Sequence, residues 1–150
     1  MWTLAACFAV AIVSALLPWV NAELMLLAVA APMTSIADLL VLVLAVTAGQ
    51  VSGKAALYWI ARRATSQSPS GRIGRAVGRW REACDRRQRS TQTMMTMSAI
   101  FGLPPFYVTT VAAGALRVDF ARFLIAAIFG RFLHFSAVAL APLAFHAGYK

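Results

Sequence analysis

Charge is scarce in this sequence, and acidic charge is the scarcest. Only 13% of the 150 residues are charged and five are acidic, whereas a soluble domain carries about 25% charged residues. Hydrophobic residues make up 61% of the chain, more apolar surface than one core of so short a chain can bury. The composition therefore predicts an all-α integral membrane protein with lipid as its solvent.

The residue types that most catalytic sites need are also few. The chain has two histidines, two cysteines and five acids, and none of them are grouped at metal-ligand spacing. The sequence contains no nucleophile elbow and no phosphate-binding loop, and two cysteines indicate no disulfide framework. We therefore expect no enzyme activity, no metal and no cofactor.

Basic residues are concentrated in one segment. Nine arginines lie between residues 62 and 89, opposed there only by Glu82 and Asp85. Because Arg-rich loops near membrane ends stay cytoplasmic, we place residues 62–89 on the cytoplasmic side of a bacterial inner membrane. No nucleic-acid recognition module surrounds these arginines, so nucleic-acid binding is not expected.

The same segment has a helical apolar stripe. Ile73, Val77, Trp80 and Cys84 recur at spacings of four, three and four between the arginines. This pattern is typical of a basic amphipathic helix that lies on the inner leaflet. An ordinary solvated loop is the alternative.

Four apolar blocks flank this segment. Residues 36–61 and 120–145 are each long enough to cross a hydrocarbon core of about 30 Å. Residues 2–31 and 93–116 are interrupted, because proline and the polar residues beside it disfavour a continuous helix. The interruptions fall at Pro18, Asn21 and Glu23 in the first block, and at Gly102, Pro104 and Pro105 in the third.

Each interrupted block is either a kinked transmembrane helix or a re-entrant hairpin. Arg89 precedes the third block, and Arg117 and Arg122 follow it. Arginines at both ends favour a hairpin that enters and leaves on the cytoplasmic side. We thus expect two re-entrant hairpins and two full spans in one membrane domain, residues 1–150.

The two halves of this domain follow the same order. Residues 1–62 and 92–150 each contain a broken block and then a long span, and residues 63–91 link them. Matching interrupted segments in halves of opposite orientation predict an inverted repeat with a site at the membrane midplane, where the hairpin tips would meet.

Ionisable residues inside the apolar blocks are the candidate site. Glu23 is either a titrating group or a helix N-terminal charge beside the cap Asn21. Arg131 and His134 share a helix face, and Arg131 is a candidate ligand for a lipid phosphate. A structural pair between Arg131 and Glu23 is the alternative, and a lone histidine is more often packing than a ligand.

Lys54 and four glycines complete the set of candidates. Lys54 is a second possible phosphate ligand, with a stem long enough to extend to the cytoplasmic surface. Gly49 and Gly53 form a small-residue face for close helix packing, and Gly114 and Gly130 are assigned the same role. Ser35 with Asp38, and Asp119, are expected to cap the long spans.

Several strings in the chain resemble a known family. They are LP at 17–18 before Glu23, GQVSG at 49–53, YWIAR at 58–62, FGLPP at 101–105, AAGALRV at 112–118 and GR at 130–131. Together they are similar to the DedA or SNARE-associated (VTT) domain family, most like its short YqaA-type members. Two features depart from the family pattern, a longer spacing between Pro18 and Glu23 and FYVT at 106–109 in place of a charged residue.

The resemblance implies facing re-entrant hairpins, a role in lipid translocation or membrane homeostasis with proton coupling, and functional roles for Glu23 and Arg131. Our leading hypothesis is a lipid flippase or scramblase whose partners are membrane lipids, protons and a second copy of the chain. The alternatives are a non-transporting module that docks a partner or anionic lipid through Arg75, Arg79 and Arg86, and a small-ion transporter.

Overall fold

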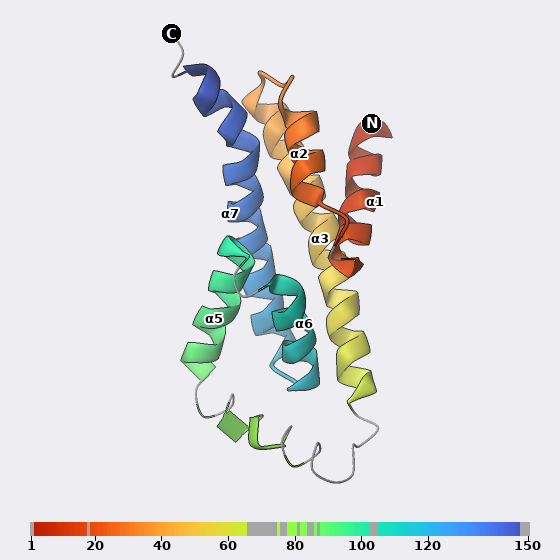
Figure 1. Ribbon diagram of the computed structural model, residues 1–150, viewed down its shortest axis with the longest axis vertical. Coiled ribbons are helices and arrows are strands. Elements are labelled where there is room, and N and C mark those ends of the chain that lie inside the picture. Colours follow the sequence, from red (N-terminus) through yellow and green to blue (C-terminus); the bar gives the residue numbers. More distant parts are fainter. Residues whose placement is uncertain are drawn as a thin grey trace. The chain divides into compact units, whose positions relative to one another are not determined.

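The computed structural model describes residues 2–17, 19–65, 75, 78–80, 82–83, 86, 88–102 and 105–147. The regular elements in these ranges are all α-helices (Figure 1): α1 (Trp2–Leu16), α2 (Ala22–Ala30), α3 (Ile36–Ala64), α5 (Gln88–Phe101), α6 (Phe106–Ala115) and α7 (Phe120–Ala147). By length and composition, α3 and the part of α7 over Phe120–Pro142 are able to cross a membrane. The predicted helical class and the two long apolar helices are therefore confirmed.

Both interrupted blocks divide into two short helices. The 15 residues of α1 and the 9 of α2 extend about 22 and 14 Å, so neither crosses the hydrocarbon core alone. The second break contains Gly102 with a φ of +72°, a left-handed conformation that glycine adopts without strain. Pro105 then precedes the first residue of α6, whereas Pro18 and Pro104 lie outside the described residues.

Side-chain caps start three of these helices. The Asn21 Oδ1 accepts hydrogen bonds from the backbone N–H of Glu23 at 2.9 Å and of Leu24 at 3.2 Å. Ser35 Oγ accepts from Asp38 N at 3.4 Å, and Asp119 Oδ1 accepts from Arg122 N at 3.0 Å. The capping roles predicted for Asn21, Ser35 and Asp119 are confirmed, since each satisfies an otherwise unpaired helix N–H.

The helices form two compact units. The first comprises Met1–Gly53 with Arg131–Lys150, and the second comprises Lys54–Gly130. Each unit contains one pair of short helices and a part of both long helices. The unit boundaries therefore differ from those of the predicted half-repeats, which end at residue 62 and begin at residue 92.

The first unit packs α1, α2, the start of α3 and the end of α7 around one apolar cluster. Leu26, Leu42, Val46 and Phe135 are fully buried in it. Gly49 permits α3 to approach α1, because a Cβ there would lie 2.5 Å from the Phe8 carbonyl oxygen. The same holds for Gly53, whose added Cβ would lie 2.5 Å from the Cβ of Ala15.

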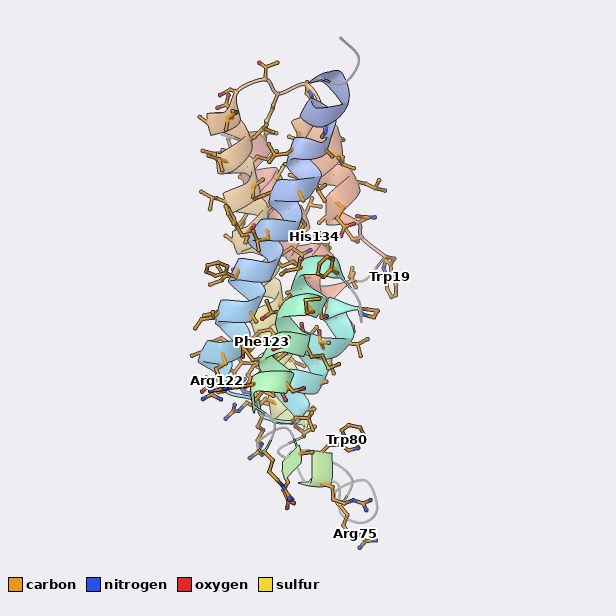
Figure 2. The ribbon with its side chains drawn as sticks, turned by 90° about the vertical axis from the view of Figure 1, so that its left-hand side faces the viewer. Trp19, Arg75, Trp80, Arg122, Phe123 and His134 are labelled. Atoms are coloured by element: carbon orange, nitrogen blue, oxygen red, sulfur yellow. The ribbon has the colours of Figure 1, made fainter. Side chains whose placement is uncertain are left out.

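The second unit has an aromatic core. The Tyr58 ring stacks on Phe123 with centroids 5.0 Å apart, and Phe123 stacks on Phe106 at 6.3 Å. The Tyr58 hydroxyl donates to the backbone oxygen of Val118 and accepts from Arg62 Nη1 at 2.8 Å. Phe123 is completely buried, while its neighbour Arg122 is exposed (Figure 2). On α7, Phe123 therefore faces the core and Arg122 faces outward.

Two further glycines lie at helix contacts in the second unit. A Cβ at Gly114 would collide with the backbone oxygen of Tyr58, and one at Gly130 would collide with the Cβ of Ala99. These contacts bring α6 against α3 and α7 against α5. Close approach at small residues is the usual way in which helices associate without water to drive them together.

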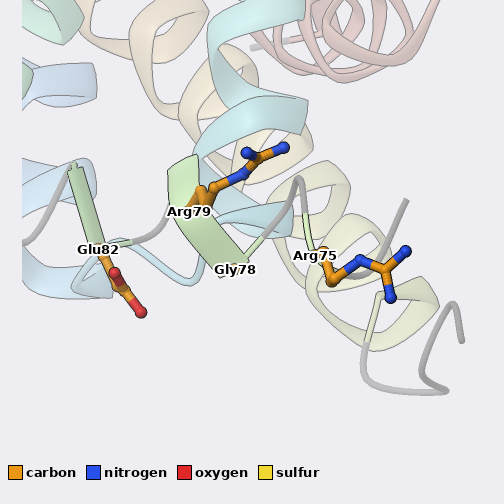
Figure 3. Close-up of a pocket in the computed structure, with 4 residues that line it drawn as sticks. All are labelled: Arg75, Gly78, Arg79 and Glu82. Carbon is orange, nitrogen blue, oxygen red and sulfur yellow. The ribbon is translucent and has the colours of Figure 1, made fainter. Parts of the chain in front are cut away.

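The predicted amphipathic helix at 71–89 lies largely outside the described residues, including Ile73, Val77 and Cys84. The described parts of this segment are helical and exposed. Arg75, Gly78, Arg79 and Glu82 surround a shallow hollow of about 610 Å³ (Figure 3). The ion pair of Arg86 with Glu82, at 3.2 Å, joins two highly exposed side chains and therefore contributes little to stability.

Candidate functional site

Glu23 is held in the first turn of α2. The Asn21 cap fixes the start of this helix directly before it. A carboxylate in this position interacts favourably with the helix dipole. The Glu23 side chain keeps 46% of its surface exposed, so it is accessible to a proton or a polar ligand.

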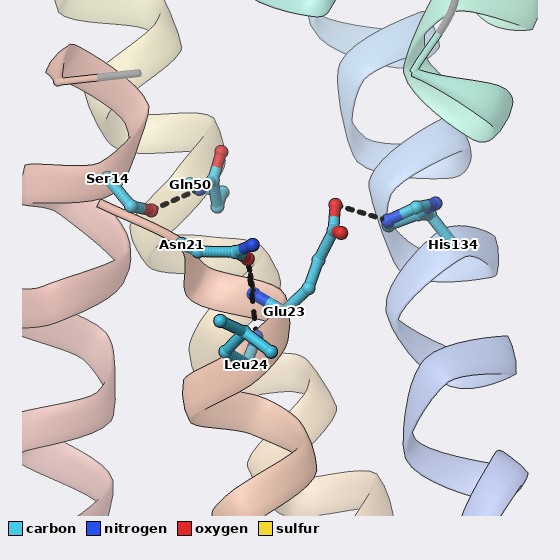
Figure 4. Close-up of polar contacts among 6 residues, drawn as sticks. All are labelled: Ser14, Asn21, Glu23, Leu24, Gln50 and His134. Carbon is cyan, nitrogen blue, oxygen red and sulfur yellow. Dashed lines mark hydrogen bonds and ion pairs between the residues drawn. The ribbon is translucent and has the colours of Figure 1, made fainter. Parts of the chain in front are cut away.

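His134 is the direct partner of Glu23. Its Nε2 lies 2.8 Å from the Glu23 Oε1, across a sequence separation of 111 residues, as Figure 4 shows. The ring N–H donates to the ionised carboxylate, and a neutral carboxyl group can instead donate to the ring nitrogen. The two side chains are therefore joined by one hydrogen bond whose donor depends on where the proton lies.

Arg131 lies one turn before His134 on α7. The two residues share a helix face, and the Arg131 charge is close enough to act on the Glu23 carboxylate. The Arg131 guanidinium also lies 5.6 Å from the centre of the Phe135 ring, a cation–π contact. The structure thus brings together Glu23, Arg131 and His134, which we term the ionisable triad, inside the first unit.

Neutral polar residues that the sequence analysis did not select lie in the same unit. Gln50 Nε2 donates to Ser14 Oγ, and Ser14 Oγ donates to the Ala11 carbonyl at 3.0 Å. Within the described part of the chain, Thr47 Oγ1 and Gln50 Oε1 are buried without a hydrogen-bond partner. The signal in the sequence was two polar residues three apart in an apolar run, Thr47 and Gln50, on one face of α3.

Lys54 belongs to the second unit. Only 3% of it is exposed, and its Nζ lies 5.1 Å from the centre of the Tyr107 ring and 5.9 Å from that of Phe106. Lys54 therefore does not extend to a surface, although its stem is long enough to do so. Its ammonium group packs against two aromatic faces of α6, and such contacts strengthen when water is excluded.

The sequence of this chain matches one known protein family. Residues 17–142 match the VTT domain. The chain belongs to the VTT domain family, also called the DedA family. No curated protein and no solved structure matches it. As a family member with two long apolar helices, it is a membrane protein.

The VTT domain match covers all members of the ionisable triad and Lys54. It begins directly before the first break and ends at Pro142, inside α7. Of the four short helices, α2, α5 and α6 lie within it, whereas α1 ends directly before its first residue. The part of the chain that carries charge inside apolar helices is therefore the VTT domain itself.

Proposed function

We propose that this VTT domain protein translocates lipid across the membrane, as a flippase or scramblase with proton linkage, in membrane homeostasis. The observation that carries the proposal is the Glu23–His134 hydrogen bond beside Arg131. Ionisable groups among apolar helices are costly and usually mark a transport pathway. An arginine guanidinium is in addition the side chain best suited to bind a phosphate group.

A charge balance explains how protons and lipid would be linked. With Glu23 ionised and His134 neutral, the single negative charge of this pair offsets the positive charge of Arg131. A proton added to the pair removes its net charge, so Arg131 can then attract an anionic lipid phosphate. Loss of that proton restores the competing carboxylate and favours release of the phosphate.

Several finer features belong to this proposal. The short helices of the two breaks and the arginines at the ends of the third block favour two re-entrant hairpins in an inverted repeat. The nine arginines between residues 62 and 89 favour a cytoplasmic position for this segment, in a bacterial inner membrane. A YqaA-type member is the subfamily that this proposal adopts, and buried Lys54 is a second candidate for phosphate contact.

Lipid exchange between leaflets tests the transport activity. The full chain is reconstituted in vesicles that contain a head-group-labelled phospholipid, and an impermeant quencher reports the label in the outer leaflet. We expect label initially on the inner leaflet to become accessible much faster than in protein-free vesicles. Exchange no faster than in protein-free vesicles, or a proton or ion flux without lipid movement, would contradict the proposal.

The re-entrant course is tested at the ends of the interrupted blocks. The natural thiols are first removed by Cys7→Ala and Cys84→Ser. Each variant then carries one new cysteine. The positions are Ser90 and Ala121 for the third block, and Trp2 and Thr34 for the first. If both blocks are re-entrant, the two members of each pair react with an impermeant maleimide from the same side. Labelling of one pair from opposite sides would instead identify that block as a kinked span.

A further inference from the structure

The second unit contains an apolar groove that the ionisable triad does not use. It has a volume of about 450 Å³, within the usual range for sites that bind small molecules. Its walls come from α5, from α6 and from the basic segment, and include Met94, Met95, Ala112, Ala113, Leu116 and Trp80. Methionine side chains adapt to flexible apolar ligands, so this lining suits a hydrocarbon chain.

Arginines directly adjoin the lining of this groove in the sequence, and we term them the rim. Three lining residues, Trp80, Ser90 and Leu116, each have an arginine directly beside them in sequence. These arginines are Arg79, Arg89 and Arg117, and all three are exposed. Ser90 and Thr91 add hydroxyl groups to the lining, and α5 continues from them to the apolar Met94 and Met95.

From this arrangement we infer that the groove binds an anionic phospholipid, with one acyl chain along α5 and α6 and the phosphate near Arg79, Arg89 and Arg117. The ligand must combine a long apolar chain with a negative head group, because the lining is apolar and three exposed arginines adjoin lining residues in the sequence. Trp80, which is 67% exposed, has the amphipathic ring that favours the head-group level of a membrane. This inference rests on the proposed function only where it names the transported lipid as anionic. The binding site itself does not require that the protein transports lipid.

Binding is measured on the full-length chain, purified in detergent and stripped of lipid. The probes are phosphatidylglycerol, phosphatidylcholine with the same acyl chains, and glycerol 1-phosphate, with bound lipid counted by native mass spectrometry. We expect phosphatidylglycerol to bind at least about tenfold more tightly than phosphatidylcholine, because an arginine near an anionic surface contributes about fivefold in affinity. Glycerol 1-phosphate should not compete, since it lacks the acyl chain.

Two triple variants separate the effect of the rim arginines on lipid binding from the effect of net charge. Arg79→Gln with Arg89→Gln and Arg117→Gln should weaken phosphatidylglycerol binding about a hundredfold, from about fivefold for each arginine. The control removes the same charge at other exposed positions by Arg75→Gln with Arg86→Gln and Arg122→Gln. It should change the affinity less than about fivefold.

The groove itself is tested by a bulky side chain. Ala112→Trp fills the groove from α6 and should weaken binding of both phospholipids, whereas Val108→Trp, at an exposed position of α6 outside the lining, should not. Equal losses in the two triple variants, or full binding by Ala112→Trp, would overturn the inference. So would a dimer that Ala112→Trp dissociates in the absence of lipid, because the occupant would then be a second copy.

The binding result is independent of transport. Intact, rim-dependent binding together with absent lipid exchange would overturn the proposed function and support this site. Lipid exchange without rim-dependent binding would do the reverse.

Discussion

Arg131→Ala is expected to slow lipid exchange by at least about thirtyfold. Hydrogen bonds from a guanidinium to a charged group contribute about 1.5–3 kcal/mol, and about 2 kcal/mol corresponds to this factor. The loss has two sources, since the variant removes the proposed phosphate ligand and the positive charge near Glu23. Glu23→Gln should reduce exchange to a similar degree, because the amide keeps the shape of the carboxyl group but takes up no proton.

The controls for this prediction lie on the same helices. Arg122→Ala removes an exposed arginine from α7 and should leave the exchange rate unchanged. Arg131→Lys keeps the charge without the planar fork and should restore only part of the rate. His134→Gln removes the ring that hydrogen-bonds to Glu23 and should slow exchange less than Glu23→Gln. Wild-type rates in both Glu23→Gln and Arg131→Ala would refute the role of the ionisable triad.

Gly114→Ala is expected to cause the largest loss of stability among the glycine variants. The new Cβ would collide with the backbone oxygen of Tyr58, which has no rotamer by which it can move aside. Overpacking of this kind typically costs about 1–3 kcal/mol, and we expect the upper end because α6 must shift as a body. Thermal unfolding in detergent, followed by circular dichroism and fluorescence, measures the effect.

Two matched variants test the cause. Gly130→Ala meets the Cβ of Ala99, so adding Ala99→Gly should recover a large part of the lost stability. Gly78→Ala meets no atom of the described chain within 4 Å of its new Cβ and should be neutral or stabilising, since alanine favours helix. If Gly114→Ala unfolds at the same temperature as Gly78→Ala, close contact with α3 is not what requires glycine at position 114.

The helices could be predicted from the sequence because their causes are local. Hydropathy and length located α3 and α7, and the residues around Pro18 and Pro105 located the two breaks. The helix α5 begins at Gln88, five residues before the apolar block that starts at 93, because polar residues such as Gln88 and Gln92 form helix as readily as apolar ones. An apolar block therefore marks the buried part of a helix better than its end.

The site was only partly predictable. Glu23 and Arg131 were conspicuous as charges within apolar blocks, yet His134 had no partner that the sequence could name. The distance of Lys54 along α3 left a surface position open, whereas its ammonium group packs against Tyr107 and Phe106. Both outcomes depend on which helix faces oppose one another, and a one-dimensional pattern does not contain that information.

The sequence by itself determined that this chain resides in a membrane. It also determined at which residues the helices break and which residues form the basic segment. These properties follow from residue solvation and backbone conformation, which act within a few residues along the chain. The tertiary structure alone decided that Glu23 meets His134 across 111 positions and that small residues bring α6 against α3 and α7 against α5. Such contacts arise from packing between distant segments, where a single Cβ or one turn of a helix determines which groups meet.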